Sequence, residues 1–430
     1  MTAMQIKEIK NEQLGEMYYD ISHPSGLKIL VMPKNGYSGA YAIFATKYGS
    51  IDNMLPQLDG SYKKIPEGTA HFLEHKLFES EDLDAFERFA KTGASANAYT
   101  SFDRTGYLFS CTGNFKKNLE ILLDFVQHPY FTQQTVQKEQ GIIGQEIMMY
   151  KDVPDWEATF NLMRALYHVH PVRVDIAGSC ESIAEITADL LYDCYKSYYN
   201  LGNMVLSIAG NVNVDDVIEV ADRMLSADNP GSKIKRQPVN EPEEIVTDYI
   251  EERLAVSSPQ FMLGFKETWD TPERSTKEEL AMEMLLDMLA GPSSQLYKRL
   301  LDKKLINTTF SYEYFTGFGY SAVLFGGESS DPKAVEKEIK AEIEKFRRDG
   351  IDKDVFSRTR KKLYGRMLIG FNDIDELANN MALSYFADED IFTDFEVYKT
   401  VTGDYISSLL DKTLLSEYSA LSVILPVEEE

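Results

Sequence analysis

The sequence predicts an α+β protein made of two α/β halves of similar plan, joined by a polar segment. Short runs rich in β-branched and aromatic residues predict strands, and longer runs with apolar residues at helical spacing predict helices. The same order of strands and helices occurs twice along the 430 residues. That length exceeds what one ordinary hydrophobic core organises, so two domains are expected.

The first half begins with strands and then alternates them with helices. Alternating apolar residues predict the first strands, and the spacing of apolar residues predicts the helices. Gly93 and Pro129 end two of these helices, and the stretch 152–154, which closes with a proline, ends the longest one. The expected elements are strands at 27–33 and 39–50, a helix opening at 67–69, a helix at 83–93, strands within 95–113, helices at 118–128 and 133–152, a strand at 203–212 and a helix at 214–225.

Residues 226–248 are polar and rich in proline, which is typical of a linker or an exposed crossing segment. We therefore expect domains at 1–225 and 249–430. All six histidines lie at or before His170, so only the first domain can build a histidine metal site. The second half is expected to contain a strand at 260–267, a helix at 278–291, strands at 306–315 and 320–329, and helices at 334–350 and 354–371.

The formal net charge of −25 argues against nucleic acid and against anionic membranes as partners. Basic or neutral peptides would be attracted, although an acidic surface commonly serves solubility alone. The N-terminal stretch lacks the apolar core of a signal peptide, and no apolar run is long enough to span a bilayer. The three cysteines do not have the spacing of a metal site, and their odd number argues against a disulfide framework, so the cytoplasm is the expected compartment.

The motif HFLEH at residues 71–75 carries the clearest chemistry of the chain. On a helix, residues four apart lie about 40° apart around the axis, so His71 and His75 can face one ion with Glu74 beside them. Two imidazoles suit zinc, and a nearby carboxylate can take a proton from a water whose pKa the ion lowers. The order His-x-x-Glu-His marks one class of zinc peptidases. The alternative is a pair of surface histidines on an amphipathic helix.

A third ligand is expected on the helix at 133–152. Glu139 and Glu146 lie seven residues apart and hence on one helix face. They are also about 10 Å apart along the axis, so one should bind the ion and the other should support a ligand or remain a helix-face charge. Glu146 stands in an apolar stretch, where an unpaired carboxylate is costly, and we expect it to be the ligand. A solvated helix face is an adequate alternative for Glu139 alone.

A stretch of small and extended residues, 93–109, follows the motif helix closely. As an edge strand beside the ion, it could accept a peptide backbone by strand addition. An ordinary internal strand is the equal alternative from residue chemistry. His168 and His170 could bind a metal as His-Val-His, but their loop favours a structural turn.

These segments resemble the pitrilysin-like zinc metallopeptidase family, M16, whose HxxEH motif defines the inverzincins. The similarity is to its small bacterial, Firmicute-type members with a processing-peptidase-like plan. It covers most of the first half in family order, whereas the second half agrees in layout only. The shared segments are GTAHFLEHKLFE, GASANAYTSFDRTGYLF, FTQQTVQKEQGIIGQEI, HPVRVDIAGSCESI and NMVLSIAGNV. The resemblance implies two homologous α/β domains of the mitochondrial-processing-peptidase-like metallohydrolase fold, each a mostly antiparallel sheet covered by helices.

The resemblance also implies a role for each motif residue. His71, His75 and Glu146 match the ligands of one zinc per chain, Glu74 the catalytic base and Glu139 a supporting acid. The family encloses short, unfolded peptides with four such domains, so a two-domain chain implies a dimer. The strand that pairs with the substrate matches Asn97, Ala98, Tyr99 and Thr100.

The chain departs from the family at one place in the second half. After a Ser-Ser-x-Leu-aromatic stretch, here 293–297, the family places an Arg and, seven residues later, a Tyr; this chain has Leu301 and Thr308. An aliphatic side chain cannot donate a charge-assisted hydrogen bond. We therefore expect a zinc-dependent endopeptidase that acts as a homodimer or as a heterodimer with a related, zinc-less chain supplying Arg and Tyr. The alternative is a non-catalytic peptide-binding or assembly subunit.

Overall fold

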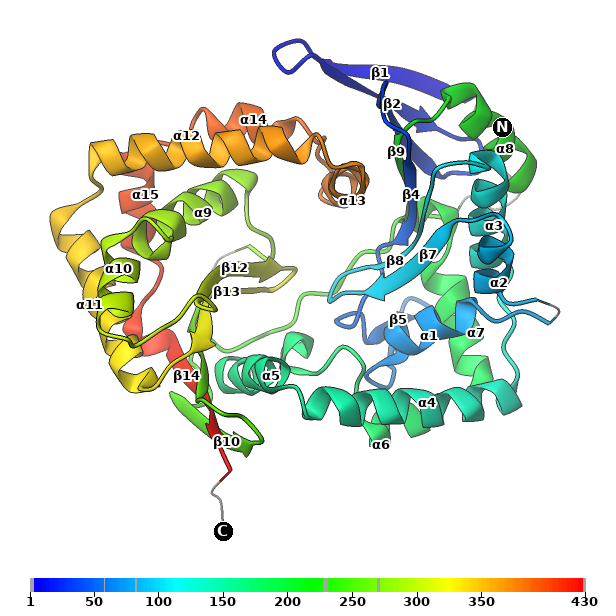
Figure 1. The fold of residues 1–430 in the computed structure, drawn as a ribbon. Helices are drawn as coiled ribbons and strands as arrows, with labels where there is room; N and C mark the ends of the chain where they lie inside the picture. Colours follow the sequence, from blue (N-terminus) through cyan, green and yellow to red (C-terminus); the bar gives the residue numbers. More distant parts are fainter. Residues whose placement is uncertain (1–3, 58, 82, 227–230, 269–270, 428–430) are drawn as a thin grey trace. The chain divides into compact units, whose positions relative to one another are not determined.

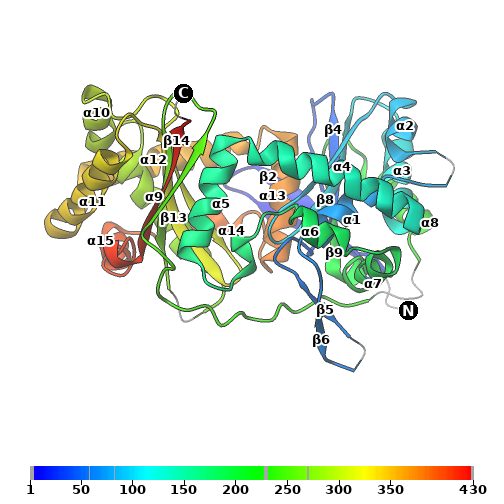
Figure 2. The same cartoon turned by 90° about the horizontal axis from the view of Figure 1, so that it is seen from below.

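The computed structural model describes residues 4–57, 59–81, 83–226, 231–268 and 271–427. The chain forms two compact units, each assembled from three separate stretches, and Figures 1 and 2 show their elements. Unit 1 comprises Met1–Gly144, Ile176–Gln237 and Leu368–Thr393, and unit 2 comprises Gln145–Asp175, Pro238–Met367 and Asp394–Glu430.

Unit 1 is built on a mostly antiparallel sheet with the strand order β1-β2-β3-β9-β4-β8-β7. One neighbouring pair, β3 with β9, is parallel. The central strands β4 and β9 are buried along their whole length, as expected for strands covered on both faces. The strands are β1 (Gln5–Asn11), β2 (Glu16–Ser22), β3 (Lys28–Pro33), β4 (Ala40–Thr46), β7 (Ser95–Thr100), β8 (Thr105–Cys111) and β9 (Met204–Gly210), with a separate pair of β5 (Met54–Pro56) and β6 (Tyr62–Lys64).

Helices cover both faces of the unit 1 sheet. Helix α13 packs against β4 and β9 on one face, and α3 packs against β4 and β8 on the other (Figure 1). The helices are α1 (Thr69–Leu77), α2 (Ala85–Ala90), α3 (Phe115–Gln127), α6 (Cys180–Ala184), α7 (Ala188–Tyr198), α8 (Val214–Met224) and α13 (Ile374–Phe386), and α4 (Gln133–Lys151) begins in this unit.

Unit 2 has a sheet of its own with the order β10-β14-β11-β13-β12, in which β10 and β14 are parallel. No helix in the described parts of the chain is long and apolar enough to span a lipid bilayer. The strands of unit 2 are β10 (Tyr249–Leu254), β11 (Gln260–Lys266), β12 (Ser311–Gly317), β13 (Tyr320–Glu328) and β14 (Ser419–Pro426). Its helices are α5 (Pro154–Leu166), α9 (Thr276–Ala290), α10 (Gln295–Asp302), α11 (Pro332–Asp349), α12 (Lys353–Gly370), α14 (Thr393–Tyr398) and α15 (Gly403–Leu410).

The two sheets repeat one plan. The order β3-β9-β4-β8-β7 in unit 1 corresponds to β10-β14-β11-β13-β12 in unit 2, and the parallel pair occupies the same place in both. Each half also exchanges one helix: α5, from the first half of the chain, packs on β11 and β14, whereas α13, from the second half, packs on β4 and β9. This repetition confirms the predicted pair of mostly antiparallel α/β domains.

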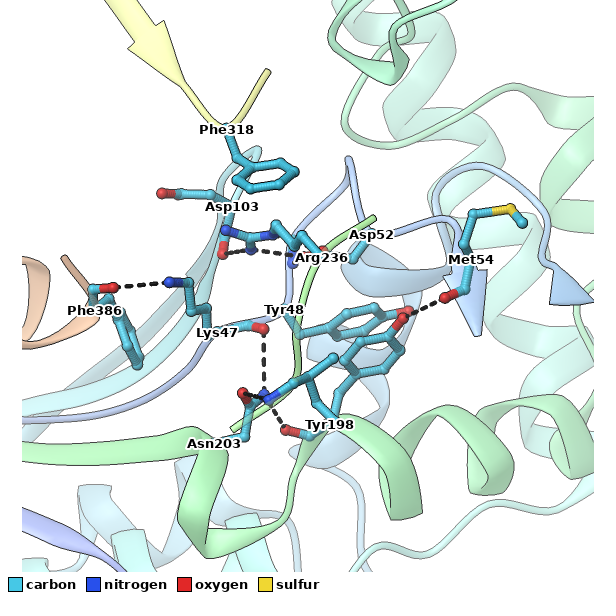
Figure 3. Close-up of polar contacts among 12 residues, drawn as sticks. Lys47, Tyr48, Asp52, Met54, Asp103, Tyr198, Asn203, Arg236, Phe318 and Phe386 are labelled. Carbon is cyan, nitrogen blue, oxygen red and sulfur yellow. Dashed lines mark hydrogen bonds and ion pairs between the residues drawn. The ribbon is translucent and has the colours of Figure 1, made fainter. Parts of the chain in front are cut away.

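The segment expected as a linker, 226–248, is held by hydrogen bonds within each unit. Residues 227–230 of it lie outside the described residues. In unit 1, the guanidinium of Arg236 donates to both carboxylate oxygens of Asp52 at 2.7 and 2.8 Å and to the carbonyl of Asp103 (Figure 3). In unit 2, Glu241 accepts hydrogen bonds from Lys266 and from the backbone N–H groups of 168–170. The limits 1–225, 226–248 and 249–430 stay a prediction.

Candidate metal centre

Helix α1 presents the HFLEH motif because its apolar side chains face the core. His71 and His75 remain half-buried on the other side of the helix. Gly68 precedes the helix at φ +84°, and a Cβ at this position would lie 2.3 Å from the carbonyl oxygen of Ala177. Only glycine therefore fits where the chain enters α1. The buried apolar residues of the helix are Ala70, Phe72, Leu73 and Leu77.

The two imidazoles stand next to each other on α1. The ring centroids of His71 and His75 are 4.6 Å apart, with an angle of 61° between the ring planes. Burial, with a smaller contribution from His75, lowers the pKa of His71 to about 3. The His71 ring is therefore neutral at physiological pH, which is the state that binds a metal ion.

Helix α4 runs beside α1 and carries both predicted carboxylates (Figures 1 and 2). Glu139 is buried, and its Oε1 lies 3.0 Å from Nδ1 of His75. The boundary between the units falls inside α4, after Gly144, so Glu146 lies on the same uninterrupted helix as Glu139. Ile143 and Ile147 anchor this helix in the core. The helix thereby places one carboxylate against a ring and the other near both rings.

The ligand atoms of His71, His75 and Glu146 all lie within 4.8 Å of one another. Across the described part of the chain, no second group of three His, Cys, Asp or Glu side chains converges in this way. Ligands held tetrahedrally at the usual zinc distances lie about 3.4 Å apart. Small side-chain rotations would therefore bring the three ligand atoms to the separations that a zinc site requires. Two imidazole nitrogens and one carboxylate oxygen are also the donor types that zinc prefers. The residues therefore fit a zinc ion.

Glu74 lies between these ligands in sequence and is 9% exposed. The hydroxyl of Thr100 donates a hydrogen bond to Oε2 of Glu74 at 2.8 Å. A hydrogen bond to an ionised carboxylate offsets part of the cost of burying the charge. The residue types and the motif predicted Glu74, but the hydroxyl that contacts it was not foreseen. Thr100 pairs with Thr105 across the turn 101–104, but no local pattern in the sequence relates this turn to the motif helix.

Strand β7 contains Asn97, Ala98, Tyr99 and Thr100 and is the outermost described strand of its sheet. It pairs with β8 on one side, so it is an edge strand and not an internal one. The side chains of Ser95 and Asn97 are exposed. Its backbone is therefore positioned for strand addition, while its pairing with a peptide remains a prediction.

The second half of the chain has different residues at the positions that correspond to Glu139 and Glu146. Glu146 lies eight residues before Pro154, which begins α5, and Arg366 lies eight residues before Ile374, which begins α13. By the same count Thr359 corresponds to Glu139. On α9, Asp287 accepts a hydrogen bond from Thr359 at 3.3 Å, as His75 contacts Glu139 in unit 1.

Asp287, which takes the place of His75 in this comparison, also contacts a cationic side chain of the protein. The ammonium of Lys362 lies 2.5 Å from Oδ1 of Asp287, whose side chain is 1% exposed. The hydroxyl of Tyr312 also donates to Asp287, at 2.9 Å. The second half of the chain thus has an ion pair with a buried carboxylate at the positions where the first half has candidate metal ligands.

Two models of known families match the chain. The model "Insulinase (Peptidase family M16)" matches residues 60–179, and the model "Peptidase M16 inactive domain" matches residues 185–363. The first match contains all candidate ligands together with Glu74 and Glu139, and the second contains the ion pair of unit 2.

The similarity extends along the whole chain. A Bacillus subtilis protein named as an uncharacterized zinc protease, YmfH, is 40% identical over 428 residues, covering 98% of this chain and 99% of that protein. The crystal structure of an M16-like peptidase from Alicyclobacillus acidocaldarius has a TM-score of 0.90 at 35% identity, covering 99% of each chain. A protease from Helicobacter pylori has a TM-score of 0.81 at 19% identity, covering 99% of this chain and 100% of the other, and shares the fold.

Proposed function

Since this chain belongs to the M16 family of peptidases, we propose that it is a zinc-dependent endopeptidase acting on short or unfolded peptides. The observation that carries the proposal is the approach of His71, His75 and Glu146 ligand atoms to within 4.8 Å of one another. A relative 40% identical to the chain is named a zinc protease, which supports zinc as the ion.

The chain's own residues supply binding and proton transfer. Zinc, when bound, lowers the pKa of a coordinated water toward neutrality and polarises a carbonyl group. Glu74, beside the ligands, is the group placed to accept a proton from the attacking water and to return it to the leaving amine. Glu139 holds the ring of His75 through Nδ1, which leaves Nε2 as the ligand atom.

The substrate is proposed to bind as an added strand on β7. An edge strand offers unpaired N–H and C=O groups, which bind any extended peptide through its backbone. Folded proteins have few extended segments free to pair, so short or unfolded peptides are the expected substrates. A formal net charge of −25 would favour basic peptides among them. The proposed compartment is the cytoplasm, where free thiols such as those of the three cysteines persist.

A partner is proposed to complete the site. Leu301 is half-buried against the apolar core of unit 2, and Thr308 is exposed before β12. Neither side chain can donate the charge-assisted hydrogen bonds that the family's Arg and Tyr provide. We infer a dimer, either of two copies or of this chain with a zinc-less M16 chain that has the Arg and Tyr.

The test compares peptide cleavage by the zinc-loaded chain alone and after mixing with such a zinc-less M16 chain. We expect stoichiometric zinc, slow cleavage alone and cleavage at least about tenfold faster in the mixture. The mass of the complex, measured by light scattering, distinguishes a homodimer from a heterodimer. Full activity of the isolated chain as a monomer would exclude the partner requirement.

A second candidate function is a non-catalytic peptide-binding or assembly subunit. The absence of Arg and Tyr at Leu301 and Thr308 favours it. Under this alternative the chain and the mixture would both bind peptides and cleave none, with or without zinc. The intact set of His71, Glu74, His75 and Glu146 favours the peptidase.

A further inference from the structure

Thr100 lies at the end of the edge strand β7, next to the carboxylate of Glu74. We infer that Thr100 is a positioning residue, which orients Glu74 through its side chain while its backbone belongs to the strand proposed to bind substrate. The inference rests on the proposed function and assigns this threonine a second role that its place in β7 alone does not imply.

The hydrogen-bond directions around Thr100 follow from its single hydroxyl proton. Its Oγ1 lies 2.8 Å from Oε2 of Glu74, and because an ionised carboxylate can only accept, Thr100 donates. Thr105 is fully buried, and its single hydroxyl proton is donated to the carbonyl of Tyr48 at 2.9 Å. Its Oγ1 lies 3.5 Å from Oγ1 of Thr100 and does not take the proton of Thr100 away from the nearer carboxylate oxygen. The proton of Thr100 is therefore directed toward Glu74.

The backbone that carries Thr100 is held firmly. Thr100 pairs with Thr105 in the hairpin of β7 and β8. The N–H groups of Ser50 and Ile51 donate to the carbonyls of residues 101 and 102 at 3.0 and 2.9 Å. Arg236 donates to the carbonyl of Asp103 in the same turn (Figure 3). These contacts hold residues 101–103, which begin the turn directly after Thr100. The position of Thr100 is therefore fixed as well.

A close approach of two chain segments supports this rigidity. A Cβ on Gly49 would lie 2.5 Å from backbone atoms of Phe102 and Asp103. The segments are thus packed backbone against backbone, which leaves little room for the turn to shift. The β-branched side chain of Thr100 adds its own restriction, since χ1 of threonine has few allowed rotamers.

This arrangement matters because a general base works only within hydrogen-bond reach of the proton it takes. A free glutamate side chain samples several rotamers, and a misplacement of about 1 Å can cost a large factor in rate. Thr100 restricts Glu74 to one orientation relative to the strand β7. The base and the proposed substrate strand are therefore aligned by one residue.

The test replaces the hydroxyl of Thr100 and compares kcat, KM and zinc content. Thr100→Val keeps the shape and removes the donor, whereas Thr100→Ser keeps the donor. We expect Thr100→Val to lower kcat about tenfold to hundredfold, with KM within about twofold and zinc content unchanged. Thr100→Ser should retain kcat within about threefold. Thr92→Val is the matched control, because Thr92 is also half-buried in unit 1 and its hydroxyl is within donating distance of the Phe89 carbonyl and of the side-chain oxygen of Asn118.

Each outcome separates this inference from the proposed function. Wild-type kcat in Thr100→Val, or an equal loss in Thr92→Val, would overturn the role of Thr100 and leave the peptidase proposal intact. Wild-type protein that cleaves nothing, alone or with a partner, would count against the proposed function instead. In that case crystal structures of the zinc-loaded wild type and Thr100→Val decide: an unchanged Glu74 carboxylate overturns the inference, and a displaced one supports it.

Discussion

Oε1 of Glu139 and Nδ1 of His75 lie 3.0 Å apart, although the two residues come from different helices. Glu139 is 6% exposed and the side chain of His75 is 26% exposed, so this contact is partly shielded from water. A carboxylate that accepts from Nδ1–H fixes the tautomer and the ring orientation of a histidine, and leaves Nε2 to bind a metal. The two acidic residues of α4 thus differ in position: Glu139 contacts a ring, and Glu146 joins the candidate ligands.

This difference predicts unequal effects on zinc binding. Glu146→Gln removes a charged ligand, and we expect the protein to lose zinc on dialysis. Glu139→Gln weakens the orientation of His75 without removing a ligand, and a loss in zinc affinity of about 10–100-fold is expected. Metal analysis and competition titration measure both effects, with the exposed Glu185→Gln as control. Retained stoichiometric zinc in Glu146→Gln would show that the third ligand is another residue.

Removal of the proposed base predicts a separation of metal binding from catalysis. Glu74→Gln keeps the side-chain shape and an oxygen that accepts from Thr100, but it cannot take a proton. We expect zinc content and thermal stability close to wild type and a loss in kcat of about 10²–10⁴-fold. Peptide cleavage by the zinc-loaded protein is the measurement. A variant that retains most of its activity would assign the base to another group.

Much of the fold follows from local patterns in the sequence. The alternation at 27–33 and 39–50 predicts β3 and β4, and the helical spacing at 133–152 predicts α4. The hairpin of β1 and β2 was not predicted, because Gln5–Asn11 is largely exposed and lacks apolar alternation. The exchange of α5 and α13 could not be predicted either, since periodicity identifies an apolar helix face but not the sheet it covers.

The part of the candidate site that lies on one helix could be predicted, because the spacing of residues along a helix fixes their relative positions. His71, Glu74 and His75 share one helix, so the period of the helix alone brings them together. The choice between Glu139 and Glu146 depended on burial and on contacts across two helices, which the sequence suggests only through the apolar neighbours of Glu146. The hydroxyl of Thr100 depends on long-range packing between β7 and α1, for which no local pattern exists.

The ion pair of unit 2 predicts a loss of stability when its cation is removed. Lys362→Met leaves the buried carboxylate of Asp287 with hydroxyl donors only. Because the Lys362 side chain is 33% exposed, we expect a moderate loss of about 1–3 kcal/mol in the free energy of unfolding. The double variant with Asp287→Asn should recover part of this loss, since no charge is then buried unpaired. Denaturant titration is the measurement, and the exposed Lys361→Met is the control.

A buried histidine predicts acid sensitivity of unit 2. His170 is 2% exposed; its Nδ1 accepts from the N–H of Val172, and its Nε2 donates to the carbonyl of Phe318 at 3.1 Å. Burial lowers its pKa from 6.5 to about 4, against the opposing effects of the Phe318 carbonyl and Glu241. The unfolded chain therefore binds a proton at a higher pH than the folded one. The stabilisation is complete above pH 6.5 and is lost as the pH falls from 6.5 toward 4, by about 3 kcal/mol in all.

The variant His170→Gln tests this sensitivity, because its amide can donate to the same carbonyl but does not titrate in this range. We expect the melting temperature of the wild type to fall more steeply between pH 6.5 and 4.5 than that of His170→Gln. His128→Gln serves as control, since the side chain of His128 is 71% exposed. If the wild type and His170→Gln lost stability in parallel over this range, the acid sensitivity would come from groups other than His170.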